Sequence, residues 1–289
     1  MTTLTSNWTI LKAANPTQFY REFITKNLRP DGRTFLQRRP VKITSGSIST
    51  ADGSCLTNIG TTSVLAAIKL EISSPHNATP TSGFLEVSVQ LTPLCSPRFN
   101  VGKPSDEAFS LQQHIQRILV ESKVIDLEQL NILEGKACWN VKLDIICLNH
   151  NGSCTDAAIL AAVGALRDLK LPAVVTKVED TNQSSRGVVV EIDPSGIASK
   201  LNMGSNIPLP LTYGKFENVW IVDPNAEEAS LMQTMLTVVV GNNGKKIYSV
   251  YKVGGESVPS DFVDEAIDSA TVISKQALDA MLGVDVRER

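Results

Sequence analysis

Three short stretches of the sequence carry side chains that could do chemistry. The first is IVDPNAEEAS, Ile221–Ser230, where a hydrophobic run ends at Asp223 and a turn with Glu227 and Glu228 follows. A carboxylate at the end of a buried strand could act as a general acid or base. The alternative is that Asp223–Asn225 only turns the chain, with the two glutamates on a solvated face.

The second stretch is GSCT, Gly152–Thr155, directly before a strongly apolar segment. If that segment is a helix, its unpaired N–H groups favour an anion at this end. The alternative is a glycine turn with a Ser or Thr cap. No Lys or Arg lies within the four residues, and the phosphate-binding pattern Gly-x-x-x-x-Gly-Lys-Ser/Thr is absent.

The third stretch is a basic group near the N-terminus, which could grip a phosphate backbone. Surface solubility or the acidic residues of a partner explain it equally well. Its members are Arg29, Arg33, Arg38, Arg39 and Lys42.

The composition limits the class of protein. The chain has 289 residues, 42% of them hydrophobic, and a net charge of −3, so any contact with nucleic acid has to be local. The three histidines and five cysteines are scattered, which predicts no metal site and no cofactor, and an odd cysteine count fits reduced thiols. We expect no membrane span and no secretion signal.

The hydrophobic pattern predicts an α+β protein of two similar halves, each with a mixed sheet and helices packed on one face. Three helices are expected: one that begins after a Ser105 cap, one over about 155–169, and one long helix over 260–282. The second should be buried on most sides. A hairpin turn is expected at Gly241–Gly244. Strands are expected at 41–49, 54–59, 63–72, 84–91, 139–148, 187–192, 209–216, 219–222, 233–240 and 246–251.

Four segments follow from this pattern. We expect an N-terminal extension and helix over 1–27 and a first domain over 28–178. The polar stretch EDTNQSSR, residues 179–186, is the expected connection, and a second domain follows over 187–289.

Four motifs resemble the RNase PH family. They are LRPDGR (28–33), SGSISTADGSCLTNIGTTSVLAAIK (45–69), PLCSPRFNVGKPSDEA (93–108) and IVDPNAEEASLMQTMLTVVV (221–240). The family includes bacterial phosphorolytic tRNA-trimming enzymes and the six-membered ring of the RNA exosome. The stretches Gly102–Glu107 and Asp223–Glu228 resemble its non-catalytic branch, the archaeal accessory ring subunit and its eukaryotic descendants. The resemblance implies an RNase PH-like fold of two halves.

In active members, as the resemblance implies, phosphate attacks the last phosphodiester of RNA. A Gly-Ser/Thr-Arg element holds the phosphate, two aspartates six residues apart serve the chemistry, and an arginine pair holds the RNA 3′ end. Gly152 and Ser153 match the phosphate element, but Cys154 stands where the arginine should be. Asp223 matches the first aspartate, and Ala229 occupies the position of the second.

The arginine pair falls on Glu107 and Ala108, so all three elements of the site are lost together. Because electrostatic stabilisation dominates phosphoryl transfer, the resemblance implies no catalytic residue, only a relic site. Arg98 and Lys103 are candidates for contacts with RNA in the channel.

The expected function is therefore that of a catalytically inactive structural subunit of the exosome ring, which supports 3′-to-5′ RNA processing and degradation and helps to form the RNA channel. The implied partners are other RNase PH-like subunits in a six-membered hetero-oligomeric ring, S1/KH cap proteins, an associated ribonuclease and single-stranded RNA. The implied locations are the nucleus, including the nucleolus, and the cytoplasm. Two alternatives stay open: a phosphate-dependent 3′-to-5′ exoribonuclease with a phosphate site rebuilt from Lys103 or Arg98, and a nucleotide-binding metabolic enzyme that uses the Gly152 turn.

Overall fold

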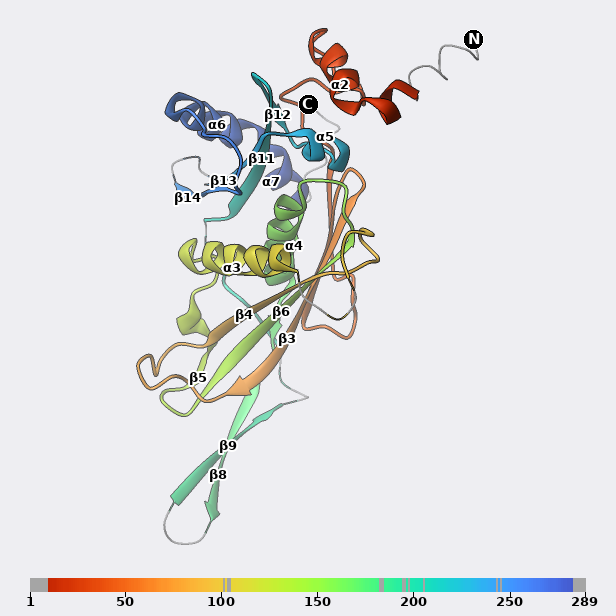
Figure 1. Ribbon diagram of the computed structural model, residues 1–289. Helices are drawn as coiled ribbons and strands as arrows, with labels where there is room; N and C mark the ends of the chain where they lie inside the picture. Colours follow the sequence, from red (N-terminus) through yellow and green to blue (C-terminus); the bar gives the residue numbers. More distant parts are fainter. Residues whose placement is uncertain are drawn as a thin grey trace.

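The computed structural model describes residues 10–282 except 101, 103, 104, 182–184, 194, 195, 197, 205, 243 and 245. Its first half is built on a six-stranded sheet in the order β1-β2-β3-β6-β4, with β5 also paired to β6 (Figure 1). The strand β4 runs parallel to β6, and the other pairs are antiparallel. The strands are β1 Val41–Ser45, β2 Gly53–Ile59, β3 Thr62–Ser73, β4 Phe84–Leu91, β5 Asn131–Leu133 and β6 Ala137–Asn149.

Two helices pack on this sheet, α3 (Asp106–Glu121) and α4 (Cys154–Asp168). The Ser105 hydroxyl caps α3 by accepting a hydrogen bond from the N–H of Ala108, as the sequence predicts. Nearly every residue of α4 is buried, which confirms the expectation from its alanine-rich composition. Small residues let this helix approach the sheet closely: a Cβ on Gly164 would lie 2.4 Å from the Sγ of Cys55.

The second half contains a four-stranded sheet in the order β12-β11-β13-β14. The expectation of a mixed sheet holds for the first half, whereas these four strands are antiparallel throughout. Strand β13 pairs with β14 as expected, although Asn243 in the predicted turn lies outside the described residues. The strands are β11 Pro208–Phe216, β12 Val219–Val222, β13 Thr234–Gly241 and β14 Ile247–Lys252.

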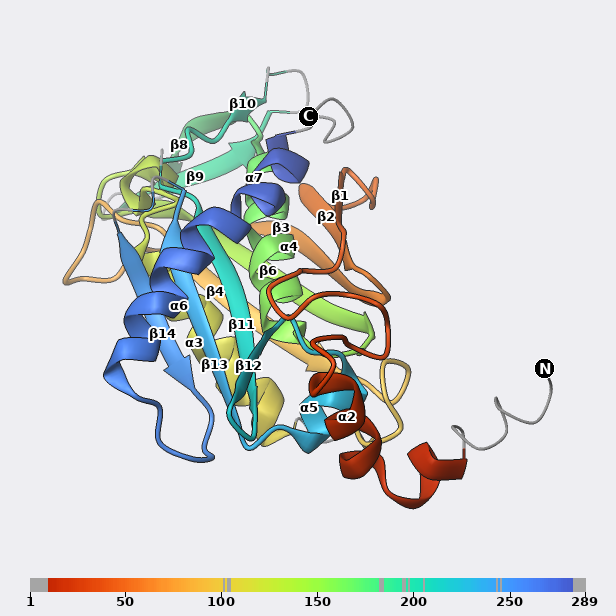
Figure 2. The ribbon, with the colours of Figure 1, turned by 90° about the horizontal axis from the view of Figure 1, so that it is seen from above.

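Helix α4 lies between the two sheets and packs on β2, β3 and β11 (Figures 1 and 2). Neighbouring residues of β11 point to opposite faces. Thr212 therefore meets Asp156 of α4, while the hydroxyl of Tyr213 donates to the carbonyl of Ala266 on the other face. Helices thus cover both faces of the second sheet, and the expectation of helices on one face alone is wrong there.

The C-terminal segment forms two helices, α6 (Ser260–Ile273) and α7 (Lys275–Leu282), so the prediction of one long helix is wrong. The break falls at Ser274, whose carbonyl accepts from the N–H groups of Ala277 and Leu278 and starts a new turn. A β-branched run precedes it, and the hydroxyl of Thr271 bonds back to the carbonyl of Ile267. Both features weaken a helix.

The polar stretch 179–186, expected as a connection, lies in a hairpin of β8 (Val174–Thr181) and β9 (Ser185–Ile192), whose tip at 182–184 is outside the described residues. This hairpin extends away from the two sheets (Figure 1). A short pair, β7 (Lys170–Leu171) with β10 (Ser199–Lys200), lies at its base.

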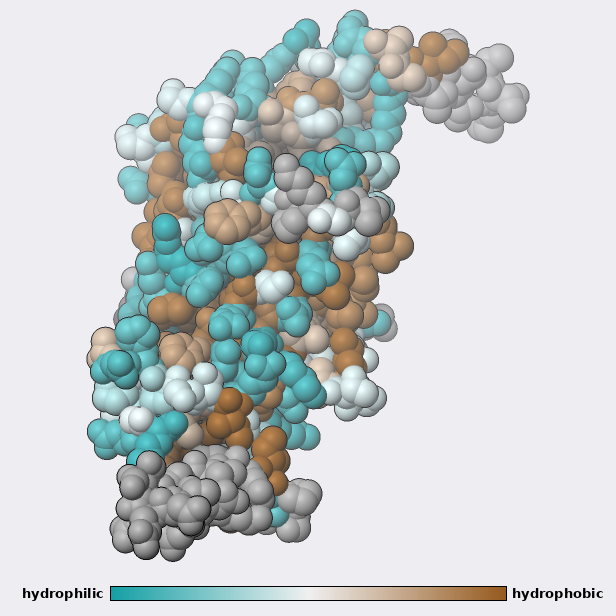
Figure 3. All heavy atoms as spheres, turned by 60° about the horizontal axis from the view of Figure 1, so that its bottom comes forward, coloured by the Kyte–Doolittle hydropathy of each residue, from teal (hydrophilic) through white to brown (hydrophobic). Residues whose placement is uncertain are grey.

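Near the N-terminus, α2 (Pro16–Ile24) begins at Asn15, whose side chain accepts from the N–H of Gln18. The helix packs through Phe19 and Tyr20 on β11 and β12. On the face drawn in Figure 3, hydrophilic and hydrophobic residues are interspersed.

Candidate functional site

The structure brings two distant loops together, the one before α4 and the one that joins β12 to α5 (Ala226–Leu231). Gly152 has a φ of +79°, and a Cβ there would lie 2.2 Å from the carbonyl oxygen of Pro224. The hydroxyl of Ser153 donates to the same carbonyl at 3.4 Å, and the N–H of Ala226 donates to the Oδ1 of Asn151 at 3.1 Å. Only glycine allows so close an approach.

Asp223 directly follows β12, with its carboxylate completely buried and a φ of 49°. Arg39 binds both carboxylate oxygens: Nη2 lies 2.7 Å from Oδ1, and Nε and the backbone N–H each lie 2.9 Å from Oδ2. Arg33 adds a contact from Nη1 to Oδ2 at 3.4 Å. Burial opposes ionisation, but the hydrogen bonds and charge of Arg39 lower the pKa of Asp223 to about 2. The carboxylate is therefore ionised and occupied by arginine donors.

Arg39 also binds the other loop. Its Nη1 donates to the carbonyl of Asn151 at 2.6 Å, and its Nη2 reaches that of Gly152 at 3.3 Å. The carbonyl of Gly152 accepts from the hydroxyl of Thr62 as well, at 2.8 Å. One buried guanidinium thus joins the loop before α4 to the end of β12.

A second arginine holds the start of α5. The Nε of Arg29 donates to the Oε1 of Glu228 at 2.9 Å, its Nη2 contacts the Oε2, and its Nη1 donates to the carbonyl of Val222 at 2.8 Å. Glu228 also completes a capping box with Asn225. The two adjacent glutamates therefore differ: Glu228 is buried, while Glu227 is exposed and pairs with Lys12 at 2.7 Å. The prediction of a solvated face holds for Glu227 and is wrong for Glu228.

The hypothesis that the basic group binds phosphate backbones is wrong for its four arginines. All four are buried, and each forms an ion pair with an acid of this chain. Lys42 alone of the group is exposed, on β1. The pairs are Arg29–Glu228, Arg33–Asp31, Arg38–Asp156 and Arg39–Asp223.

The Arg38–Asp156 pair is looser than the others. The Nη2 of Arg38 lies 3.7 Å from the Oδ2 of Asp156, and Asp156 accepts instead from the N–H and hydroxyl of Thr212 at 3.0 and 2.6 Å. Burial outweighs these contacts and raises the pKa of Asp156 to about 6. The same site therefore holds two buried aspartates whose pKa values shift in opposite directions.

Cys154 opens α4 and is almost fully buried. Its Sγ lies 3.7 Å from the Sγ of Cys147, and that contact, together with burial, raises the pKa of Cys147. Burial raises the pKa of nearby Cys95 to about 11. A group of thiols therefore occupies the position next to the first turn of α4, where a phosphate would need a cation.

The remaining predicted residues lie around this site. Ala229 sits on α5 and brings no carboxylate. Glu107, in the first turn of α3, pairs with Arg98 at 2.8 Å, and the same Nη2 lies 3.0 Å from the Nε2 of His150. Arg98 is half exposed and lies over the ring of Phe99. Lys103 lies outside the described residues.

Within the described part of the chain, no group of three or more His, Cys, Asp or Glu residues could hold a metal ion. No helix in that part is long and apolar enough to cross a membrane.

Two family models match the chain: domain 1 of the 3′ exoribonuclease (RNase PH) family over residues 37–172 and domain 2 over 206–273. The chain belongs to this family. It is 35% identical over 243 residues to exosome complex component Rrp42 of Methanopyrus kandleri, covering 84% of this chain and 86% of that protein. It is 32% identical to exosome complex component rrp43 of Schizosaccharomyces pombe, covering 90% and 93%.

Solved structures of exosome chains have the same fold as this chain. A chain of an Archaeoglobus fulgidus exosome with RNA bound to the active site superposes with a TM-score of 0.79 at 28% identity, covering 91% of this chain and 96% of that one. An archaeal exosome core gives a TM-score of 0.77 at 26% identity, covering 96% and 99%. The predicted RNase PH-like α+β fold is confirmed, and the chain is a homologue of exosome core components.

Proposed function

We propose that this chain is a catalytically inactive structural subunit of an exosome ring. Its similarity to Rrp42 and rrp43 over nearly their full length supports ring membership. The observation that carries the inactivity is the state of Asp223, whose two oxygens accept hydrogen bonds from Arg39 in a completely buried site. A carboxylate with a pKa of about 2 and no open side is a poor base.

The other residues of the site support the same proposal. Cys154 offers a thiol where the family uses a permanently charged guanidinium, and Ala229 offers a methyl group where it uses a carboxylate. A thiol cannot replace the bidentate hydrogen bonds of arginine to phosphate. Glu107 adds negative charge where active members bind RNA phosphates. Arg39 and Asp223 instead hold the loop before α4 against the end of β12, and the site thereby stabilises the fold.

In the ring, the proposed neighbours are other RNase PH-like subunits, with S1/KH cap proteins above them and an associated ribonuclease that receives the RNA. The pairing of PLCSPRF (93–99) with ICLNHNG (146–152) resembles exosome component eight, which suggests its position in the ring. The resemblance suggests work in the nucleus, including the nucleolus, and in the cytoplasm. Arg98 is the proposed contact with RNA in the channel, because its guanidinium is half exposed despite its pair with Glu107. Lys103 stays a second candidate.

The alternative of an active phosphate-dependent exoribonuclease requires a cation at the start of α4. Of the two cations suggested for this role, Arg98 and Lys103, only Arg98 lies within the described residues, and it touches His150, two residues before Gly152. As a phosphate ligand at the start of α4 it would have to leave Glu107 and His150, whereas a contact with RNA from its exposed side would not require this.

The proposal is tested by the mass and composition of the native particle that a tagged copy of the chain brings down from its own cells. A hetero-oligomer with several RNase PH-like chains and S1/KH proteins is expected. A homo-hexamer, or a lone chain that releases nucleoside diphosphates from RNA when phosphate is added, would contradict it.

A further inference from the structure

The strand β4 has an unpaired edge. It is an end strand of the first sheet and is bonded, among the described strands, to β6 alone. The carbonyl of Leu85 accepts a long contact of 3.5 Å from the Nε2 of Gln116 on α3. Alternate residues of a strand direct their backbone groups to the same side. One of the two alternating sets of backbone groups along β4 therefore faces that edge.

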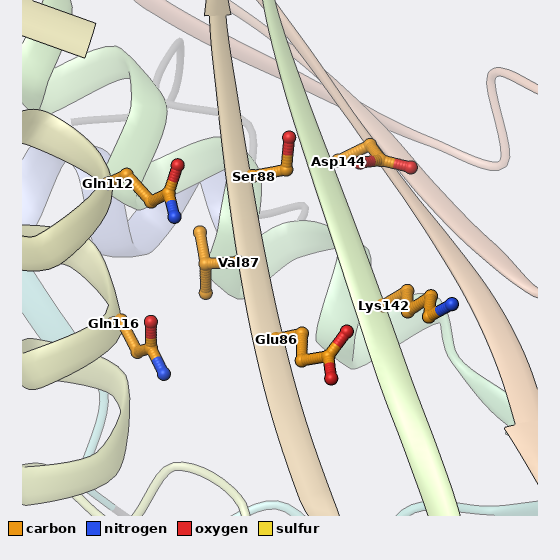
Figure 4. Close-up of a pocket in the computed structure, with 7 residues that line it drawn as sticks. All are labelled: Glu86, Val87, Ser88, Gln112, Gln116, Lys142 and Asp144. Atoms are coloured by element: carbon orange, nitrogen blue, oxygen red, sulfur yellow. The ribbon is translucent and has the colours of Figure 1, made fainter. Parts of the chain in front are cut away.

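A groove follows this edge. Two neighbouring hollows of about 440 and 450 Å³, which both have Ser88 and Gln112 in their linings, lie between β4 and α3 and together make up this groove. Gln112 and Gln116 reach from α3 toward β4, and Val87 points toward the helix between them (Figure 4). Eight residues of strand extend about 26 Å. The groove therefore has the length and the hydrogen-bonding groups for one extended chain.

The two ends of the groove differ in polarity. At the end of β4, Leu91 and Pro93 line it together with Phe109, whose side chain is 61% exposed. Leu94, 77% exposed, follows directly in the chain. This end suits an apolar side chain.

The start of β4 is acidic. Glu86 and Asp144 line the groove there, and Lys142 is held by Glu71 at 2.6 Å. Lys69 lies opposite Lys142 on β3, so three carboxylates face two ammonium groups. The excess of negative charge suits a basic side chain.

We propose that the β4–α3 groove binds an extended peptide segment of a partner protein by strand addition. The segment adds to the β4 edge, places an apolar side chain by Phe109 and places a basic side chain by Glu86 and Asp144. Because antiparallel pairing is the more stable arrangement, the apolar residue precedes the basic one. The proposal goes beyond the ring function and does not rest on it.

The test uses the full-length chain and a fluorescein-labelled octapeptide of alternating valine and threonine, with leucine at its second position and lysine at its seventh. Fluorescence polarisation is expected to show saturable binding. Gln112→Trp fills the groove and should weaken binding at least about tenfold. Gln113→Trp is the matched control, since its exposed side chain on α3 lies outside the groove, and it should bind as the original chain does.

The charge reversal Glu86→Lys with Asp144→Lys gives a second readout that loss of structure alone cannot imitate. The original chain should bind the lysine peptide about two- to fivefold more tightly than the same peptide with glutamate at its seventh position. The charge-reversed variant should prefer the glutamate peptide by a similar factor, as expected for exposed ion pairs. The proposal would be overturned if Gln112→Trp and Gln113→Trp bound the peptide with equal affinity, or if the original chain did not bind it. Protection of the β4 amides from hydrogen exchange by a ring neighbour in the assembled particle would also overturn it.

Discussion

The end of β12 and the edge of β4 are both lined with polar groups, yet they treat those groups in opposite ways. At β12, the carboxylates of Asp223 and Glu228 are buried and bound by Arg39 and Arg29. At β4, the backbone groups on one edge meet a groove and a single long contact from Gln116. The end of β12, which we propose to be a relic of the family's catalytic site, is thus closed and internally neutralised, while the edge of β4 is left open.

Removal of the guanidinium that closes the site should have the largest effect on stability. Arg39→Ala leaves the Asp223 carboxylate buried without its main partner, which should cost about 3–5 kcal/mol in the free energy of unfolding. Urea denaturation followed by circular dichroism measures it.

Arg21→Ala is the matched control, because Arg21 forms an exposed pair with Glu217 at 2.9 Å. That loss should stay under about 1 kcal/mol. Equal losses for the two variants would show that the buried pair is no more important than a surface one.

The second test separates the close approach of the two loops from backbone strain. Gly152→Ala introduces both a strained φ and a methyl group 2.2 Å from the carbonyl of Pro224, and we expect a loss of about 3 kcal/mol. Gly135→Ala has a similar φ of +68° with nothing within 4 Å of the added Cβ, and should cost about 1 kcal/mol. Thermal unfolding of both variants gives the difference, and equal shifts would contradict the loop contact.

The third test uses pH. The pKa of Asp223 is about 2 in the folded chain against 3.8 ordinarily, so the folded state binds fewer protons than the unfolded state between these values. Its stabilisation is complete above the unfolded pKa and is lost as pH falls toward 2, by about 2 kcal/mol. In Asp223→Asn this acid-dependent loss should disappear from urea titrations at successive pH values.

Asp156 has the opposite sign. Its pKa is raised to about 6, so its contribution is present below pH 4 and is lost as pH rises through 6. For Asp223, the contradicting result would be that Asp223→Asn loses as much unfolding free energy at low pH as the original chain does. The arginine contacts would then not hold that carboxylate ionised.

The smallest expected effect is on activity. Cys154→Arg combined with Ala229→Asp introduces two of the groups that the resemblance to active family members implies, yet we expect no phosphorolysis, because Glu107 and the Arg39-bound state of Asp223 remain. Release of nucleoside diphosphates from single-stranded RNA, with folding checked by circular dichroism, measures it. Activity in this variant would show that only those two positions separate the chain from an enzyme.

Local sequence predicted much of the fold. The Ser105 cap, the span of β4 and the burial of α4 follow from neighbouring residues, and the family motifs located both loops of the site. The roles of the arginines could not be predicted in this way, because Arg39 and Asp223 are 184 positions apart in the sequence. A local cluster of basic residues also normally indicates an exposed surface. One missed signal was available: Asn225 followed three residues later by Glu228 is a capping-box pattern that predicts a specific place for that glutamate.

We propose that Asp223 contributes to structure and does no catalysis. The most direct test of this claim is phosphate-dependent release of nucleoside diphosphates by the ring reconstituted from this chain and its RNase PH-like neighbours, without the associated ribonuclease. We predict that Asp223→Asn leaves any such release unchanged while lowering the stability of the chain. Phosphate-dependent release that is lost in Asp223→Asn, in rings that still assemble, would contradict the claim.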